Sequence, residues 1–84
     1  MITNEKDGDM EFEEGKDYLV YKGGVKIGSV IGDEFIRTLD NELVYRIDGE
    51  EIYTAGSNAE FIGNMSGLTG IDLSNQEIFT LELH

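Results

Sequence analysis

The side chains that could do chemistry in this sequence are almost all carboxylates. The chain has 18 aspartate and glutamate residues, no cysteine, and one histidine, His84. A serine or cysteine nucleophile needs an adjacent base, usually histidine, so the usual pairings cannot be built. Paired carboxylates, as in glycosidases, could still act, but so many acids in 84 residues give close pairs by chance. We predict no catalytic residues and a protein that is not an enzyme.

Two acidic stretches are weak candidates for a cation site. Residues 7–11, with the sequence DGDME, resemble the start of a calcium loop, but the glycine and the closing acid do not fit the EF-hand spacing. Residues 48–51, with the sequence DGEE, could hold calcium weakly, but solvated acids at a turn are the favoured explanation. We therefore expect no metal site and no cofactor.

The distribution of charge favours an interaction with a basic protein. The formal net charge is -12, and no lysine or arginine follows Arg46. Such a field attracts basic protein surfaces, and it repels nucleic acid and anionic membranes. The alternative is that the charge only keeps the protein soluble. The acids after Arg46 are Asp48, Glu50, Glu51, Glu60, Asp72, Glu77 and Glu82.

Aromatic residues would anchor such a contact, because they often dominate binding energy at interfaces. The candidates are Tyr21, Tyr45, Tyr53 and Phe79, and the alternative is that they are core or half-buried strand residues. By analogy of charge and size with small acidic phage-encoded inhibitors, the module could be an inhibitor of its partner. The predicted interaction site consists of Asp48, Glu50, Glu51, Tyr45, Tyr53 and Glu60.

Two other functions stay open. A ring of repeats would bring equivalent groups around one axis, where a small ligand or cation could bind. A structural protein could self-associate through an exposed segment or strand edge. The length indicates one domain, as a monomer or small homo-oligomer. With no signal peptide and no apolar run near the roughly 20 residues that span a bilayer, we expect a cytoplasmic protein without membrane contact.

Short strands must position these side chains, because turn residues recur at a fixed interval. A spacing of 17 residues separates Gly24, Asn41, Asn58 and Asn75, which indicates a repeat architecture. Each repeat contains an outgoing strand, a turn and a return strand, over residues 18–34, 35–51, 52–70 and 71–84. Glycine and asparagine suit these turns because they tolerate left-handed backbone angles. The alternative is that the asparagines form a ring of ligands.

The predicted fold is all-β, with four tandem 17-residue β-hairpin repeats. One hairpin is not stable alone, and a closed ring removes exposed strand edges. We therefore expect a closed or nearly closed pseudo-fourfold arrangement, with the repeat register slipping in residues 63–70. The same interval places Ile27, Val44, Phe61 and Ile78 at the centre, and Val30, Ile47 and Leu81 in a second layer with Met65 in the third repeat.

Residues 1–17 differ from the rest of the chain. They hold many acids and few apolar residues, so they cannot bury enough surface to offset their ordering entropy. We predict a mobile acidic arm, with one short strand around Met10–Phe12, followed by a β-hairpin-repeat domain over residues 18–84.

Three stretches carry a resemblance to a known family. They are YLVYKGGVKIG from Tyr18, FIRTLDNELVY from Phe35 and IYTAGSNAEFIG from Ile52, each an apolar strand, a glycine or asparagine turn and a return strand. With the chain length, they resemble the small bacterial 4-fold beta flower proteins over residues 18–84. The resemblance implies a fold, and it implies no activity and no functional residue.

Overall fold

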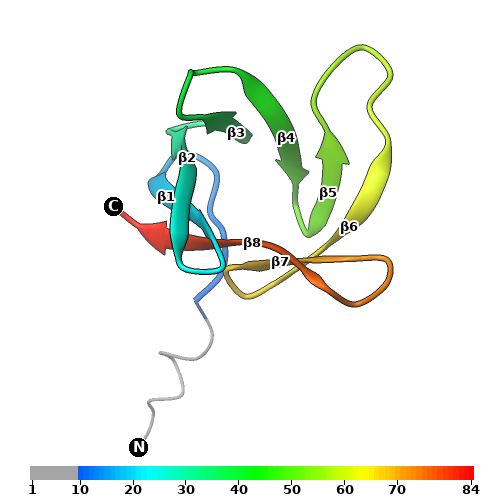
Figure 1. Ribbon diagram of the computed structural model, residues 1–84. Coiled ribbons are helices and arrows are strands. Elements are labelled where there is room, and N and C mark those ends of the chain that lie inside the picture. The colour runs from blue at the N-terminus through cyan, green and yellow to red at the C-terminus, as the bar shows by residue number, and fades with distance from the viewer. Residues whose placement is uncertain (1–9) are drawn as a thin grey trace, which may run out of the picture.

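Eight short strands close into an antiparallel barrel (Figure 1). The structure is a computed structural model that describes residues 10–84, and residues 1–9 lie outside the described part. Each strand pairs with the next in sequence, and β1 pairs with β8 to complete the ring. The strands are β1 (Asp17–Lys22), β2 (Val25–Ile31), β3 (Phe35–Thr38), β4 (Leu43–Asp48), β5 (Glu51–Thr54), β6 (Phe61–Ser66), β7 (Thr69–Asp72) and β8 (Glu77–Leu83).

The barrel is built from four sequential hairpins whose loops point away from its centre (Figure 1). The all-β class and the closed ring of hairpins predicted from the sequence are confirmed. Closure lets each short hairpin pair on both sides, which a lone hairpin in water cannot do. Within residues 10–84, no helix is long and apolar enough to cross a membrane.

Each hairpin contains one irregularity, and it falls at the corresponding place in all four. The register shifts directly after Val20, Ile36, Ile52 and Gly70. A shift of this kind is a β-bulge, which bends a strand and increases its twist. The residue before each shift and its partner on the return strand form the pairs Val20–Gly28, Ile36–Tyr45, Ile52–Gly63 and Gly70–Phe79.

Glycine and aromatic residues alternate around the ring in these pairs. Gly28 and Gly63 are the return-strand members in the first and third hairpins, while Tyr45 and Phe79 hold this place in the second and fourth. The rings of Tyr45 and Phe79 lie 5.6 Å apart between centroids. Two large side chains therefore pack together, and two glycines leave room for the strands beside them.

The core differs in part from the one expected. Val30, Ile47 and Leu81 are buried, as predicted for the second layer, and the half-buried Met65 packs against the core. The predicted central layer is wrong, because Ile27, Val44 and Ile78 are only half-buried and Phe61 is exposed. The buried core consists of Tyr18, Val20, Val30, Ile36, Ile47, Ile52, Phe79 and Leu81.

A longer loop explains why Phe61 fails the pattern. A main-chain hydrogen bond from Thr38 to Glu42 closes the β3–β4 loop. The corresponding bond of the β5–β6 loop runs from Thr54 to Glu60, so this loop is two residues longer. The third hairpin is therefore shifted against the 17-residue interval, and Ile62 takes the half-buried place expected for Phe61. The predicted slip of register does occur, but it begins before residue 63.

Two of the three turn asparagines have the backbone that the sequence predicts. Asn41 and Asn75 both have φ of 67°, in the left-handed region, and their loops share one hydrogen-bonding scheme. Thr38 Oγ1 accepts the main-chain N–H groups of Asp40 and Glu42, and Asp72 Oδ1 accepts those of Ser74 and Gln76. Asn58 has no positive φ, because the longer loop turns at Gly56 instead.

The stretch expected to be loose is regular. β6 continues to Ser66, Gly67 turns the chain with φ of 63°, and β7 begins at Thr69 rather than at Ile71. The polar Thr69 is thus a strand residue, paired with both Ser66 and Thr80.

The described part of the predicted arm covers one end of the barrel. The Phe12 ring packs against the core and lies 5.4 Å from the Tyr18 ring. The Glu13 main-chain N–H donates to Tyr18 Oη at 2.9 Å. No strand forms over Met10–Phe12, so that prediction is wrong. The acidic stretch of residues 1–9 lies outside the described residues.

Candidate interaction surface

The predicted interaction residues lie on neighbouring strands but do not all face the same way. Asp48 ends β4, Glu50 lies in the β4–β5 turn, and Glu51 begins β5. All three are exposed. Tyr53 is a half-buried residue of β5, and Glu60 is exposed directly before β6. The predicted acids therefore lie on β4 and β5 or directly beside the strands β4 to β6.

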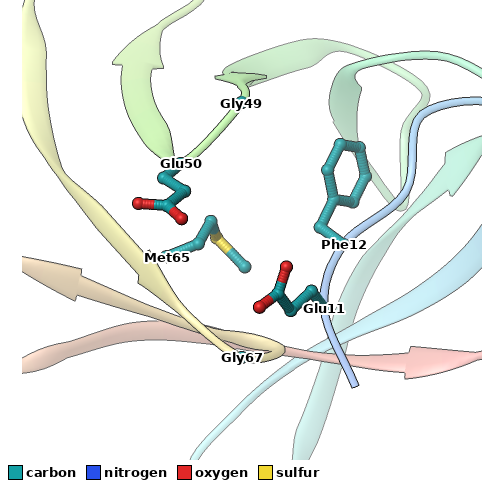
Figure 2. Close-up of a pocket in the computed structure, with 6 residues that line it drawn as sticks. All are labelled: Glu11, Phe12, Gly49, Glu50, Met65 and Gly67. Atoms are coloured by element: carbon teal, nitrogen blue, oxygen red, sulfur yellow. The ribbon is translucent and has the colours of Figure 1, made fainter. Parts of the chain in front are cut away.

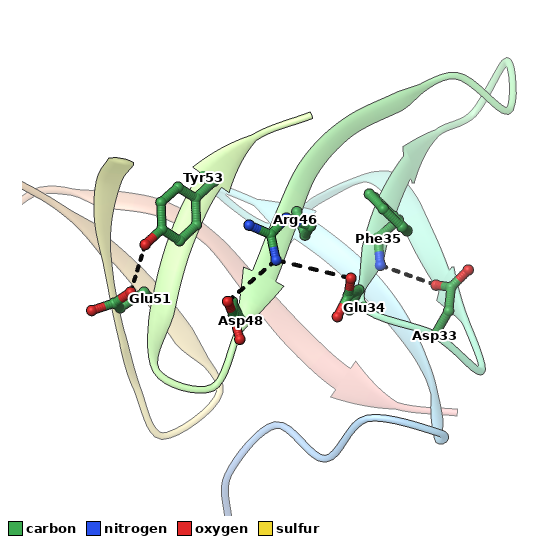
Figure 3. A network of polar contacts seen from close by, with 7 residues as sticks. All are labelled: Asp33, Glu34, Phe35, Arg46, Asp48, Glu51 and Tyr53. Atoms are coloured by element: carbon green, nitrogen blue, oxygen red, sulfur yellow. Dashed lines mark hydrogen bonds and ion pairs between the residues drawn. The ribbon is translucent and has the colours of Figure 1, made fainter. Parts of the chain in front are cut away.

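Arg46, which the predicted site does not include, lies between Asp48 and Glu34 (Figure 3). Its Nη1 is 3.3 Å from Asp48 Oδ2 and 3.9 Å from Glu34 Oε2. The guanidinium also lies 4.9 Å from the centroid of the Tyr53 ring, within cation–π range. One arginine thus pairs with two carboxylates, offsets one of their two negative charges, and covers one face of an aromatic ring.

Tyr53 links this arginine to a further acid. Its hydroxyl donates to Glu51 Oε1 at 2.6 Å (Figure 3). That hydrogen bond raises the pKa of Tyr53 above its ordinary value. Partial loss of hydration and the negative charges of Glu51 and Asp48 act in the same direction, while Arg46 opposes them. The phenol therefore stays protonated and holds the Glu51 carboxylate in place.

Phe61 provides the apolar part of the surface. It pairs with Tyr53 across β5 and β6, and the two rings meet edge to face with centroids 5.7 Å apart. Its exposed fraction is 42%, which is high for a phenylalanine. We define the acid–aromatic face as the set Arg46, Asp48, Glu51, Tyr53, Glu60 and Phe61.

Two aromatic residues expected as anchors lie elsewhere. Phe79 is fully buried, so the expectation that it anchors a partner is wrong. Tyr45 is half-buried and packs against the core beside Phe79, which fits the alternative that it is a packing residue. Their place in the barrel follows from pairing with Gly70 and Ile36.

The contact of Arg46 with Tyr53 could have been predicted from the register of β4 and β5. The Gly49–Glu50 turn pairs Asp48 with Glu51, and this register brings Arg46 opposite Tyr53. A two-residue hairpin turn fixes the pairing of the residues that flank it. Phe61 could not be found in the same way, because its place depends on the length of the irregular β5–β6 loop.

Glu50 lies on a different surface, at the end of the barrel that the Met10–Lys16 segment covers. A cavity of about 40 Å³ there is lined by Glu11, Phe12, Gly49, Glu50, Met65 and Gly67 (Figure 2). Its size suits a water molecule. Among residues 10–84, no group of three or more histidine, cysteine or acidic side chains could hold a metal ion.

Ion pairs divide the described surface into two parts. Arg37 pairs with Asp33, and Arg46 pairs with Glu34 and Asp48. By contrast, no ion pair involves an acid of residues 51–84. The hairpins β5–β6 and β7–β8 therefore present carboxylates with no cationic partner in the described structure.

Comparisons of this chain with protein-family models, curated proteins and solved structures found no match. The resemblance to the 4-fold beta flower proteins thus stays a prediction from the sequence.

Proposed function

We propose that this protein is a non-enzymatic binding module that engages a basic protein surface through the acid–aromatic face. The observation that carries the proposal is the exposed Phe61 ring against Tyr53, whose hydroxyl bonds Glu51, with the exposed Glu60 directly before Phe61 in the chain. Neither acid forms an ion pair in the described structure. Aromatic anchors with a charged rim are typical of protein interfaces. Inhibition of the partner is one form that this function could take.

Charge supports a protein partner over nucleic acid. The formal net charge of -12 repels phosphate backbones, and it speeds association with basic surfaces at low salt. Arg46 positions the Tyr53 ring. Its guanidinium stacks on one face of that ring, and the ring still contacts Phe61 on β6. A cytoplasmic location and a monomer or small homo-oligomer remain predictions from the sequence.

We further propose that the four hairpins follow a pseudo-fourfold arrangement. The register shift that recurs after Val20, Ile36, Ile52 and Gly70 supports it. The exact interval varies, since 17, 18 and 16 residues separate the paired residues Gly28, Tyr45, Gly63 and Phe79.

Capture of basic proteins with matched variants tests the proposed function. The immobilised protein should retain proteins of high isoelectric point from a cell lysate, and raising salt from about 50 to about 200 mM should release them, because salt screens exposed charges. The variant Glu51→Gln/Glu60→Gln should lose most of this capture. The variant Asp40→Asn/Glu42→Gln, which removes two charges from the β3–β4 loop, is the control and should retain it.

Three outcomes would contradict the proposal. The captured proteins could be no more basic than the lysate, or capture could be indifferent to salt. Equal losses in the two variants would show that total charge, and not the acid–aromatic face, is responsible.

A further inference from the structure

A second concave surface is lined by residues of β1, the β1–β2 loop and β8. The strands β1 and β8 meet where the barrel closes (Figure 1). The surface is an open groove of about 680 Å³, within the range of about 300 to 1,000 Å³ that ligand sites occupy. None of its residues belongs to the acid–aromatic face. The lining residues are Tyr21, Gly23, Gly24, Glu77, Thr80, Leu81 and Glu82.

The walls of the groove combine an aromatic ring with an open approach. Tyr21 and Thr80 are opposite one another in the β1–β8 pairing. A Cβ atom added at Gly23 or Gly24 would meet no atom within 4 Å, so this rim carries no side chain and faces open space. An extended chain could therefore approach the Tyr21 ring across the β1–β2 loop.

A hydroxyl group, and not a cation, orients the Glu77 carboxylate of the groove. Thr80 Oγ1 donates to Glu77 Oε2 at 3.0 Å. Partial loss of hydration raises the pKa of Tyr21, and the charge of Glu82 and a hydrogen bond to it raise this pKa further. Each carboxylate keeps free acceptor capacity, because it has two oxygens and about four lone-pair sites.

Two lysines lie close to the groove: Lys26 is opposite Tyr21 in the β1–β2 pairing and forms no ion pair among the described residues, whereas Lys22 is already engaged. Lys22 Nζ lies 3.1 Å from the main-chain oxygen of Glu77 and 3.4 Å from that of Ile78. It holds the end of β1 to β8 and does not line the groove. Among residues 10–84, neither Glu77 nor Glu82 forms an ion pair.

We propose that this groove binds an arginine side chain of the basic partner, with the guanidinium between the Tyr21 ring and the Glu77 and Glu82 carboxylates. This inference rests on the proposed function and names the group that the partner must present. A guanidinium is planar and weakly hydrated, so it can stack on an aromatic ring while its N–H groups bond carboxylates. A lysine ammonium lacks the planar fork and fits less well.

Titration of the full chain with Nα-acetyl-arginine amide tests the inference by NMR. The main-chain amide signals of Tyr21, Thr80 and Glu82 should shift together. Glu82→Gln should weaken binding about tenfold, because a charge-assisted hydrogen bond is lost. Tyr21→Leu should weaken it about two- to fivefold through loss of the cation–π contact. Dispersed spectra of the variants verify that they fold.

Two controls separate this site from general charge attraction. Nα-acetyl-citrulline amide has nearly the same shape without the charge and should not bind. Glu42→Gln removes one negative charge from the exposed β3–β4 loop, outside both the groove and the acid–aromatic face, and should leave binding unchanged. Shifts centred elsewhere, equal binding of citrulline, or equal losses in Glu42→Gln and Glu82→Gln would overturn the inference.

The groove and the proposed function can fail separately. Salt-sensitive capture of basic proteins that is unaffected by Tyr21→Leu and Glu82→Gln would refute the groove alone. Arginine binding in the groove without capture of basic proteins would refute the proposed function and leave a site for a small organic cation.

Discussion

Gly70 and Phe79 face each other across β7 and β8, and the phenylalanine ring fills the space that a side chain at Gly70 would take. A Cβ atom at Gly70 would lie 2.7 Å from Phe79 Cζ and 2.9 Å from Ile52 Cδ1. Real Cβ atoms essentially never come this close to other atoms. The fit between one glycine and one aromatic ring therefore helps to define the centre of the barrel.

Gly70→Ala should destabilise the protein by about 1 to 3 kcal/mol, the usual cost of overpacking a core. Gly70 has no positive φ, so the loss comes from the contact with Phe79 and Ile52 and not from backbone strain. Urea unfolding measures it. Ser74→Ala in the exposed β7–β8 loop is the control and should change stability by less than about 0.5 kcal/mol. An unchanged unfolding midpoint for Gly70→Ala would show that the ring moves aside freely.

Gly28→Ala and Gly63→Ala should each cost more than Gly70→Ala. A Cβ atom at Gly28 would collide with the main-chain carbonyl of Arg37, and one at Gly63 with that of Ile71. Main chain held in a sheet cannot rotate away as a side chain can, so we expect about 3 kcal/mol or more. Thermal unfolding of the three variants side by side gives the order. If Gly70→Ala were the most damaging, the close strand approach at Gly28 and Gly63 would be in doubt.

The 17-residue interval is enough to predict strands, turns and closure, because these depend on local backbone preferences and on the need to pair every edge. It could not predict which face of a return strand points inward. That choice depends on a β-bulge in each hairpin, and a shift of one residue exchanges the two faces of a strand. The sequence therefore placed Ile27 and Val44 in the centre, where the structure has Gly28 and Tyr45.

The candidate site was only partly predictable for a similar reason. Charge along the chain identified Glu51 and Glu60, since acids without basic neighbours can be read directly. The contact of Arg46 with Tyr53 needed the β4–β5 register, and the exposure of Phe61 needed the length of the β5–β6 loop. Properties that depend on pairing between strands are the ones that the sequence left open.

Asp33 should make stability depend on pH in acid. Burial alone would raise the pKa of Asp33. The hydrogen bonds from Arg37 and from the Phe35 main-chain N–H, together with the charge of Arg37, outweigh this effect and lower the pKa below its ordinary value of 3.8. Arg37 Nη2 is 2.9 Å from Asp33 Oδ2, and the Phe35 nitrogen is 3.0 Å from Oδ1. Because the pKa of Asp33 is lower in the folded state than in the unfolded state, its ionised carboxylate stabilises the fold at pH values above the unfolded-state pKa. This stabilisation is lost as the pH falls through the folded-state pKa.

Asp33→Asn should therefore lower the free energy of unfolding at pH 7 by up to about 1 kcal/mol, a modest figure because solvent screens this partly exposed pair. The difference from the native protein should vanish once the pH falls below the folded pKa of Asp33. Asp40→Asn, in the exposed β3–β4 loop, should give a small difference that does not change over the same range. A constant deficit for Asp33→Asn at all pH values would contradict the ion pair as its source.

Tyr53 should titrate above its ordinary pKa of 10.0, because its hydroxyl donates to the Glu51 carboxylate. Ultraviolet absorbance of the tyrosinate, compared between the native protein and Tyr53→Phe, isolates this residue. Glu51→Gln should move the pKa of Tyr53 back towards 10.0. A raised pKa favours the protonated phenol in the fold, so its stabilising effect is present below pH 10 and is lost as pH rises through the folded pKa. No change in Glu51→Gln would rule out this hydrogen bond in solution.

Phe12 should hold the Met10–Lys16 segment against the barrel. Phe12→Ala removes a half-buried ring from the Tyr18 ring and should cost about 1 to 2 kcal/mol, less than truncation of a fully buried phenylalanine. Met10→Ala, at an exposed position in the same segment, is the control and should have little effect.

Tyr18→Phe tests the same contact from the other side. It keeps the ring and removes only the hydroxyl that accepts the Glu13 main-chain N–H, so it should cost about 0.5 to 1.5 kcal/mol. Because both contacts depend on the segment staying docked, the double variant Phe12→Ala/Tyr18→Phe should lose less stability than the sum of the two single variants. Strict additivity in urea unfolding would mean that the Phe12 ring and the Glu13 hydrogen bond hold the segment independently.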